Sequence, residues 1–366
     1  MKELITGPRS SRAEALARPR TSFYAASALL LSAAMAGCTG SLDEVDVASA
    51  SLEEGQAEGA LEISDGSGDD AAPGGSTPAA TLACAPLCNG SCTPIDLATI
   101  NIGGAVYMAL TDQYVYFGGG YGSEVGDDKV RRVPKAGGAR TTIVDRLTHM
   151  TRLVGSGPYA YFAASAPRLG SSLNRVNPDG TITAVPITGG YPSGVAVDST
   201  HIYWIGNKRS DIYARPLSGG SASLLIPRGA GSRQSLFEDE DSLYYIESAS
   251  SGMMKAPKSG ATAPIRFIPR VSWYLAFDED NVYYVNGGVH RMPKSGGTPV
   301  QLATGGTRVA VDDERIYWLD GTALRAMCKD GTGTQVLAST SEPYNLAVDS
   351  TGVYWAGEGK IRKIAK

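Results

Sequence analysis

The chain has 366 residues, of which 33 are basic and 37 acidic, so its formal net charge is only -4. The sequence contains no basic run and no stripe of alternating basic and aromatic residues, and this excludes nucleic acid as a partner. The 45 glycines and 18 tyrosines indicate a β-rich globular protein, and the length allows one large domain or two ordinary ones.

Residues 1–37 have the pattern of a signal peptide. Basic residues from Lys2 to Arg20 precede an apolar run from Phe23 to Ala36, which ends in small residues. This run is shorter than the roughly 20 residues that span a membrane, and no later segment is longer and equally apolar. We therefore expect an exported protein that does not itself cross the membrane.

The segment Met35–Cys38 resembles the lipobox of bacterial lipoproteins. In that family the cysteine is alkylated with diacylglycerol and becomes the N-terminus after cleavage, so the resemblance implies lipidation of Cys38. Two or three acyl chains on the N-terminal cysteine are enough to anchor a protein stably in a membrane. Met35 stands where the family usually has leucine, and an ordinary secretion signal is the alternative. Thr39, in place of the aspartate typical of inner-membrane retention, favours the outer membrane.

Residues 38–92 form the predicted connection between the anchor and a folded domain. From Gly40 to Thr81 the chain is small and acidic, with ten carboxylates and no lysine, arginine or aromatic residue. Such a segment buries too little apolar surface to offset its chain entropy, so we expect a disordered, self-repelling spacer. A metal-binding role is less favoured, because the carboxylate spacing is irregular.

Four cysteines follow Cys38 in the sequence. Cys84, Cys88 and Cys92 are spaced four residues apart, and Cys328 lies far downstream. An even number of cysteines in an oxidising compartment predicts two disulfides, whose pairing the sequence leaves open. A metal site with three thiolates is the alternative.

The rest of the chain is built from internal repeats. Each unit has four short strand-like runs in about 40 residues, with glycine-bearing turns and no helical periodicity, and this pattern predicts a blade of a β-propeller. A buried-strand tyrosine marks each unit, and in five units an aspartate suited to a tight turn lies five residues before it. The marker tyrosines are Tyr116, Tyr161, Tyr203, Tyr244, Tyr283, Tyr317 and Tyr354.

The seven units predict a seven-bladed, all-β propeller over residues 93–366. The last unit ends after three strands, whereas residues 93–99 mimic residues 298–304, the fourth strand of the fifth unit. We therefore expect residues 94–98 to supply the fourth strand of the last blade, since an open ring would expose a strand edge and an apolar face.

The repeats resemble the YWTD-type propellers of lipoprotein receptors and of related bacterial lipoproteins. Three Tyr-Trp pairs carry the likeness, at Tyr203, Tyr317 and Tyr354, and it extends over about three quarters of the chain. Those receptor propellers usually have six blades and a Thr-Asp pair after the tryptophan, which is absent here. The resemblance therefore implies the fold, and no ligand follows from it.

No catalytic motif or cofactor-binding motif stands out in the sequence. The three histidines, His149, His201 and His290, fall at different repeat positions, so a shared metal or catalytic centre is not expected. We predict no catalytic residue, metal or cofactor, and favour binding over catalysis. A propeller enzyme of the lyase, lactonase or glycosidase type is the alternative, and an assembly factor for envelope proteins is another.

The mouth of the propeller channel is the predicted binding site. Residues nine to eleven positions before the marker tyrosines should meet there, and they include several arginines and aromatics that could hold an acidic peptide, a glycan or an anionic small molecule. The alternative is that the aromatics pack between blades and the arginines are solvated. The candidates are Tyr107, Arg152, Arg233, Gln234, Trp273, Tyr274, Arg308, Tyr344 and Asn345.

Lysines recur near the aspartate-bearing turns, on the opposite face of the ring. We interpret them as exposed charges that keep this face soluble, where any Lys–Asp pair would contribute less than about 1 kcal/mol. A basic docking ring is the alternative. The sequence as a whole predicts a monomeric binding or scaffold protein of the cell envelope, which contacts the membrane only through its lipid anchor and recognises a protein, peptide or glycan. The lysines are Lys135, Lys258, Lys294 and Lys329.

Overall fold

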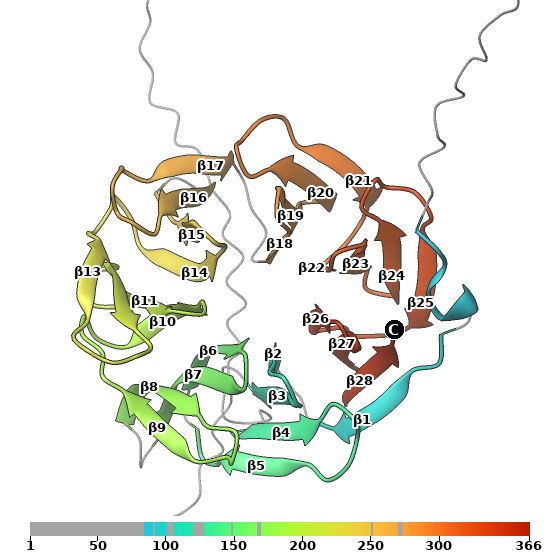
Figure 1. The fold of residues 1–366 in the computed structure, drawn as a ribbon, viewed down its shortest axis with the longest axis horizontal. Helices are drawn as coiled ribbons and strands as arrows, with labels where there is room; N and C mark the ends of the chain where they lie inside the picture. Colours follow the sequence, from blue (N-terminus) through green and yellow to red (C-terminus); the bar gives the residue numbers. More distant parts are fainter. Residues whose placement is uncertain are drawn as a thin grey trace, which may run out of the picture. The chain divides into compact units, whose positions relative to one another are not determined.

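Seven four-stranded antiparallel sheets surround a central channel in the computed structural model (Figure 1). The structure describes residues 84–90, 92–100, 106–119, 128–147, 149–166, 170–249, 252–269 and 274–366. Each sheet is one blade, and its first strand lies at the channel while its fourth lies at the rim. The predicted seven-bladed propeller is confirmed.

Blades are numbered in chain order, and one short 3-10 helix, η1 (Leu87–Gly90), precedes them. Blade 1 contains β2 (Val106–Leu110), β3 (Tyr114–Gly119), β4 (Val130–Pro134) and β5 (Thr141–Val144); blade 2 contains β6 (His149–Ser156), β7 (Tyr159–Ala166), β8 (Gly170–Val176) and β9 (Ile182–Val185). Blade 3 contains β10 (Pro192–Val197), β11 (His201–Gly206), β12 (Ile212–Pro216) and β13 (Ser223–Ile226); blade 4 contains β14 (Arg233–Glu238), β15 (Ser242–Glu247), β16 (Gly252–Pro257) and β17 (Ile265–Pro269). Blade 5 contains β18 (Leu275–Phe277), β19 (Asn281–Val285), β20 (Gly288–Pro293) and β21 (Val300–Thr304). Blade 6 contains β22 (Arg308–Val311), β23 (Arg315–Leu319), β24 (Ala323–Cys328) and β25 (Gln335–Ser339).

Blade 7 is closed by the N-terminal strand, as predicted. It contains β26 (Asn345–Asp349), β27 (Gly352–Gly357), β28 (Lys360–Ala365) and, as its outer strand, β1 (Ile95–Thr99). Figure 1 shows the cyan β1 beside the red β28, and the two strands pair antiparallel (Ile95 with Lys363, Thr99 with Lys360). The ring therefore joins the two ends of the folded chain and leaves no blade incomplete.

Each second strand is buried on both faces because a neighbouring blade covers each side. The marker tyrosines lie in these strands and are at most 4% exposed, and Trp204, Trp318 and Trp355 beside them are equally buried. Burying side chains of this size contributes a large share of the apolar stabilisation of a fold. The repeated tyrosine thus marks the packing layer between blades.

The conserved spacing of aspartate and tyrosine within the repeat has a direct structural cause. In blade 4, one carboxylate oxygen of Asp239 accepts hydrogen bonds from the backbone N–H groups of Asp241 (3.1 Å) and Ser242 (2.8 Å), and these bonds stabilise the tight turn. The other oxygen accepts the hydroxyl of Tyr244 at 2.8 Å. The sequence predicted the turn but not the tyrosine hydrogen bond. The same 2.8 Å bond joins Tyr203 to Asp198, Tyr283 to Asp278 and Tyr317 to Asp312.

A lysine of the next blade pairs with this aspartate and thereby joins two blades. Lys294 of blade 5 lies 3.3 Å from Asp239 of blade 4, and its side chain is only 19% exposed. We call each such pair a Lys–Asp clasp, and the face that carries the clasps the clasp face. The prediction that these lysines are merely exposed solubilising charges is wrong, and Lys366 belongs to the same set. The other clasps are Lys258–Asp198 (2.7 Å), Lys329–Asp278 (3.0 Å), Lys135–Asp349 and Lys366–Asp312.

Blade 2 is the blade without a clasp among those described. At its junction with blade 1, Thr111 and Pro178 occupy the aspartate and lysine positions, and at its junction with blade 3 Ser156 and Leu217 do so. Both members of the pair are thus replaced together. A lone aspartate or lysine there would be a partly buried charge without a partner, which is costly.

The N-terminal segment crosses from blade 6 to blade 7 at the clasp face. Cys84 forms a disulfide with Cys328 at the end of β24, and Cys88 forms a second disulfide with Cys92. The two predicted disulfides are confirmed, and they occupy all four thiols. Leu87 exchanges hydrogen bonds through its backbone with the Gln335 side chain (3.1 and 3.2 Å).

No helix in the described part of the chain is long and apolar enough to cross a membrane. The proposed signal peptide, Cys38 and the acidic spacer lie outside the described residues.

Candidate functional site

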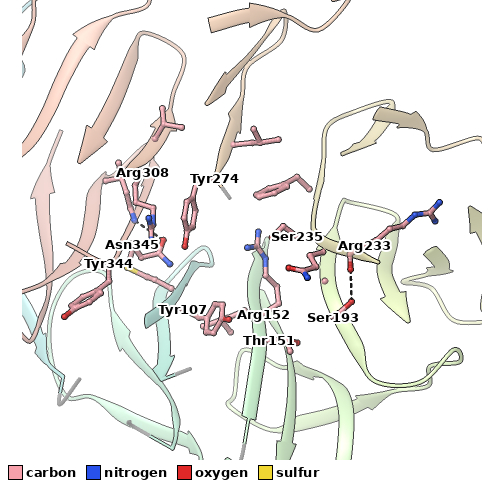
Figure 2. A pocket seen from close by; sticks show the side chains of 18 of the residues that line it. Tyr107, Thr151, Arg152, Ser193, Arg233, Ser235, Tyr274, Arg308, Tyr344 and Asn345 are labelled. Atoms are coloured by element: carbon pink, nitrogen blue, oxygen red, sulfur yellow. Dashed lines mark hydrogen bonds between the residues drawn. The ribbon is translucent and has the colours of Figure 1, made fainter. Parts of the chain in front are cut away.

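A cavity of about 660 Å³ opens at the mouth of the channel, on the face opposite the clasps. It lies there because the first strands of all seven blades begin at this face and converge, so their first residues face one another (Figure 2). Asn207 and Ser210, from the connection between β11 and β12, also line it. We call this face the mouth face.

Eight of the nine predicted site residues line the cavity. Their shared distance from the marker tyrosine places them at the same level of the ring. Trp273, the ninth, lies outside the described residues, and the role of the set in ligand binding stays a prediction. The eight are Tyr107, Arg152, Arg233, Gln234, Tyr274, Arg308, Tyr344 and Asn345.

Small hydroxyl residues that the sequence analysis missed also line the cavity, and they lie at irregularities in the first strands. The register shifts next to Thr151 in β6, Ser193 in β10 and Ser235 in β14, and Ser235 has a positive φ of 49°. Bulges of this kind redirect side chains and are frequent beside binding sites. The Thr151 hydroxyl donates to the carbonyl of Pro192 (2.8 Å), which ties blade 2 to blade 3.

Arg308 lies over an aromatic ring. Its guanidinium carbon lies 3.4 Å from the ring centroid of Tyr274, and one Nη donates to the carbonyl of Thr307 at 2.8 Å. Its Nε is buried and has no hydrogen-bond partner. Burial lowers the pKa of Arg308, against the opposing effect of Tyr274, but an arginine remains protonated in a protein. The cavity wall thus contains a fixed positive charge.

Arg152 projects toward the centre of the channel from β6. Its guanidinium carbon lies 5.0 Å from the ring centroid of Phe237, and its Nε is buried without a hydrogen-bond partner. Burial lowers the pKa of Arg152, while Tyr107 and Tyr274 act in the opposite direction. Burial likewise raises the pKa of Tyr107, so this phenol stays neutral and can donate a hydrogen bond at neutral pH. Figure 2 shows Arg152, Tyr107 and Tyr274 around one space.

Arg233 has a different environment from the other two arginines. Figure 2 shows its side chain directed away from the cavity. Its Nε donates to Glu247 (3.2 Å), and one Nη donates to the carbonyls of Ser210 and Ile226 (3.2 Å each). The residue is only 4% exposed. Its charge is therefore matched inside the protein, where it fastens the β11–β12 connection to blade 4.

No carboxylate lines the cavity among the described residues. None of the three histidines lines it either: His201 contacts Thr200, and His290 contacts the carbonyl of Gly288. The described residues also contain no group of three histidine, cysteine or acidic side chains that could hold a metal. The cavity thus combines two arginines, which have no counter-ion among the residues that the structure describes, with hydroxyl, amide and aromatic groups.

The sequence matches no protein-family model and no curated protein. Among solved structures, the chain is similar to virginiamycin B lyase from Staphylococcus aureus, with a TM-score of 0.54, 14% identity and coverage of 75% of this chain and 99% of that one. It is also similar to YCF48 from Cyanidioschyzon merolae (TM-score 0.55, 14% identity, 75% and 98% coverage) and to YCF48 bound to the D1 peptide (0.56, 14%, 75% and 97%). At such low identity these likenesses show the fold alone. The chain has the propeller fold that binding proteins and lyases share.

Proposed function

We propose that this propeller is a binding module that takes an acidic peptide segment at its channel mouth. One observation carries the proposal: Arg152 and Arg308 line a cavity in which no described residue is a carboxylate. Partly buried charges without a partner are costly, and a folded protein keeps them where a ligand supplies the opposite charge. Guanidinium groups match carboxylates well, because both are planar and form paired hydrogen bonds.

A peptide fits the cavity better than a glycan does. Sugars are typically held against open aromatic faces, whereas Arg308 covers a face of Tyr274 and Arg152 lies over Phe237. The hydroxyl and amide groups of Ser193, Asn207 and Gln234 can bond the backbone of an extended chain. A propeller of the same fold, YCF48, has been solved with a peptide bound, so this architecture can hold one.

The enzyme alternative finds less support in the geometry. Lyases, lactonases and glycosidases need a general acid or base at the reacting bond, usually a histidine or a carboxylate. The described lining of the cavity offers arginine, tyrosine, serine and amide groups instead. The cavity is therefore better suited to holding an anion than to transferring a proton.

The proposal can be tested with an acetylated, amidated hexaglutamate peptide and its hexaglutamine counterpart. We expect hexaglutamate to bind at least about tenfold more tightly by fluorescence polarisation, with an affinity that falls as salt screens the charges. The double substitution Arg152→Met and Arg308→Met should remove this preference, whereas Arg228→Met, at an exposed arginine outside the cavity, should leave it unchanged.

Equal binding of the two peptides, or a preference that survives the double substitution, would contradict the proposal. Tighter binding of a galacturonate oligosaccharide of similar charge would replace the peptide with an acidic glycan. The melting temperature of each variant establishes that it is folded.

We further propose that the propeller is exported and attached to the outer surface of a membrane through a lipid on Cys38. This proposal takes residues 1–37 as the signal peptide and residues 38–92 as the spacer and cysteine-rich segment. The two disulfides support it, because such bonds persist in oxidising compartments. Labelling of cells with radioactive palmitate should mark the wild-type protein but not Cys38→Ser. Equal labelling of both, or label in neither, would contradict lipidation at this residue.

A further inference from the structure

The two unmatched arginines approach the cavity from opposite sides of the ring. Arg152 comes from β6 in blade 2, and Arg308 comes from β22 in blade 6. Each is oriented by a different aromatic residue, Phe237 in blade 4 and Tyr274 just before blade 5. The two positive charges are therefore placed independently and are not a single cluster.

Tyr274 separates the two guanidinium groups. Figure 2 shows its ring between them, with Arg308 stacked on one side and Arg152 across the cavity on the other. Tyr274 acts electrostatically on the pKa of both arginines, and its ring centroid lies 3.4 Å from the guanidinium carbon of Arg308. A single carboxylate bound to one guanidinium would thus have the phenol between itself and the other.

From this arrangement we infer that the cavity recognises two separate carboxylates of one peptide, one at Arg152 and one at Arg308, on either side of Tyr274. This inference rests on the proposed function and makes it more specific. A ligand with one carboxylate satisfies one arginine and leaves the other, partly buried charge unmatched. A ligand with two correctly spaced carboxylates satisfies both, and the second contact is intramolecular once the first has formed.

The lining residues give the two contacts different surroundings. Arg152 and Tyr107 line the same part of the cavity and interact electrostatically, and burial raises the pKa of Tyr107, so this phenol stays protonated and can donate a hydrogen bond to a ligand there. Arg308 lies at the first residue of β22, close to Tyr274. Because the two sites differ, the peptide should bind in one direction.

The test uses a series of acetylated, amidated peptides in which two glutamates are separated by zero to four glycines. Isothermal titration calorimetry should show one spacing that binds at least about tenfold more tightly than its single-glutamate versions, in which either glutamate is replaced by glutamine. With the best peptide, Arg152→Met should remove the effect of replacing one glutamate, and Arg308→Met should remove the effect of replacing the other. Tyr274→Phe, which keeps the ring, should preserve the preferred spacing.

Single-glutamate peptides that bind as tightly as every two-glutamate peptide would overturn the two-point inference. If that binding still required Arg152 and Arg308, the proposed function would stand without it. If no glutamate peptide bound, the proposed function itself would fail. A loss of both glutamate effects with either arginine variant would show one shared site and would also overturn the inference. Arg228→Met is the matched control, since that arginine is exposed and outside the cavity.

Discussion

Blades 2 and 5 are held in the same ring by different means. Strands β6 and β7 of blade 2 have 8 residues each, and their side chains pack into apolar clusters shared with both neighbouring blades. Blade 5 begins with β18, which has only 3 residues, all partly exposed. Clasps join blade 5 to both neighbours, whereas neither junction of blade 2 has one. Short strands with clasps thus replace long strands with a larger apolar interface.

Glycine makes the close approach at blade 2 possible. A Cβ atom on Gly155 of β6 would lie 1.7 Å from the carbonyl oxygen of Leu110 in blade 1, so only glycine fits there without movement of the backbone. At this junction the backbones themselves are in close contact, next to Thr111 at the aspartate position. The comparison teaches that blade junctions of one repeat can be charged or apolar, provided that both partners change together.

Lowering the pH should have the largest effect on stability, because protonation of the aspartates weakens all five clasps at once. At Asp239, burial acts to raise the pKa, but the bonds from Tyr244, the Ser242 backbone and Lys294 outweigh it and hold the pKa below the ordinary 3.8. A lowered folded-state pKa contributes stability that is present above 3.8 and is lost as the pH falls through the folded value. The other clasp aspartates shift in the same direction: Asp198, Asp278, Asp312 and Asp349.

We therefore expect urea unfolding to show a loss of several kcal/mol between about pH 5 and about pH 3. Hydrogen exchange followed by mass spectrometry should show blade 5 losing protection before blade 2. On the alkaline side, burial and the aspartate bond raise the pKa of Tyr244, so its contribution is present below pH 10 and is lost as the pH rises further. Uniform loss of protection around the ring in acid would contradict the division into two kinds of junction.

Removing a single clasp at blade 5 should lower the free energy of unfolding by less than acid does, but by a measurable amount. Asp278→Asn keeps one oxygen for the N–H groups of the turn, but it replaces the oxygen that faces Tyr283 and Lys329 with an uncharged amide group. We expect a loss of about 2 kcal/mol in the free energy of unfolding, since both groups are mostly buried. The control is Asp280→Asn, at an exposed carboxylate in the same turn, which should change it by less than about 0.5 kcal/mol. Equal effects of the two substitutions would show that the clasp contributes nothing.

The smallest expected effect is that of building a clasp where blade 2 lacks one. Ser156→Asp and Leu217→Lys would place the missing pair at the junction with blade 3, beside Tyr161. Each single substitution should destabilise, because it introduces an unmatched charge, and Leu217→Lys also removes apolar packing. A double-mutant cycle from urea unfolding should give a favourable coupling of about 1 kcal/mol. Strictly additive effects would show that the rest of this junction cannot accommodate a clasp.

The repeat pattern alone was sufficient to predict the number of blades and the closing strand. The tyrosine and aspartate positions recur because each is tied to packing or turn geometry within one blade, and such local constraints are visible in a sequence. The sequence places Lys294 near the aspartate-bearing turns, but the burial of its pair with Asp239 is not visible, because that burial depends on the packing of two neighbouring blades. The lysines were therefore misinterpreted as exposed charges, although their absence from blades 2 and 3 coincides with the loss of aspartate from blades 1 and 2.

The cavity was predicted less completely than the fold. Counting back from the marker tyrosines located Arg152, Tyr274 and Arg308, because the first strands start at a common level. The same count could not separate Arg233, whose guanidinium turns back to Glu247, from the two arginines without a counter-ion. The bulge residues Thr151 and Ser193 were missed, since a one-residue irregularity leaves no mark on composition. A small hydroxyl residue ten positions before the marker in both blades was the available signal.

The Cys84–Cys328 disulfide fastens the start of the described chain to blade 6. Cys328 ends β24 at the clasp face, so the disulfide holds Cys84 on the side of the ring opposite the cavity. A force applied to the chain before Cys84 would therefore act on blade 6 through the disulfide. It would not reach the pairing of β1 with β28, which closes the ring.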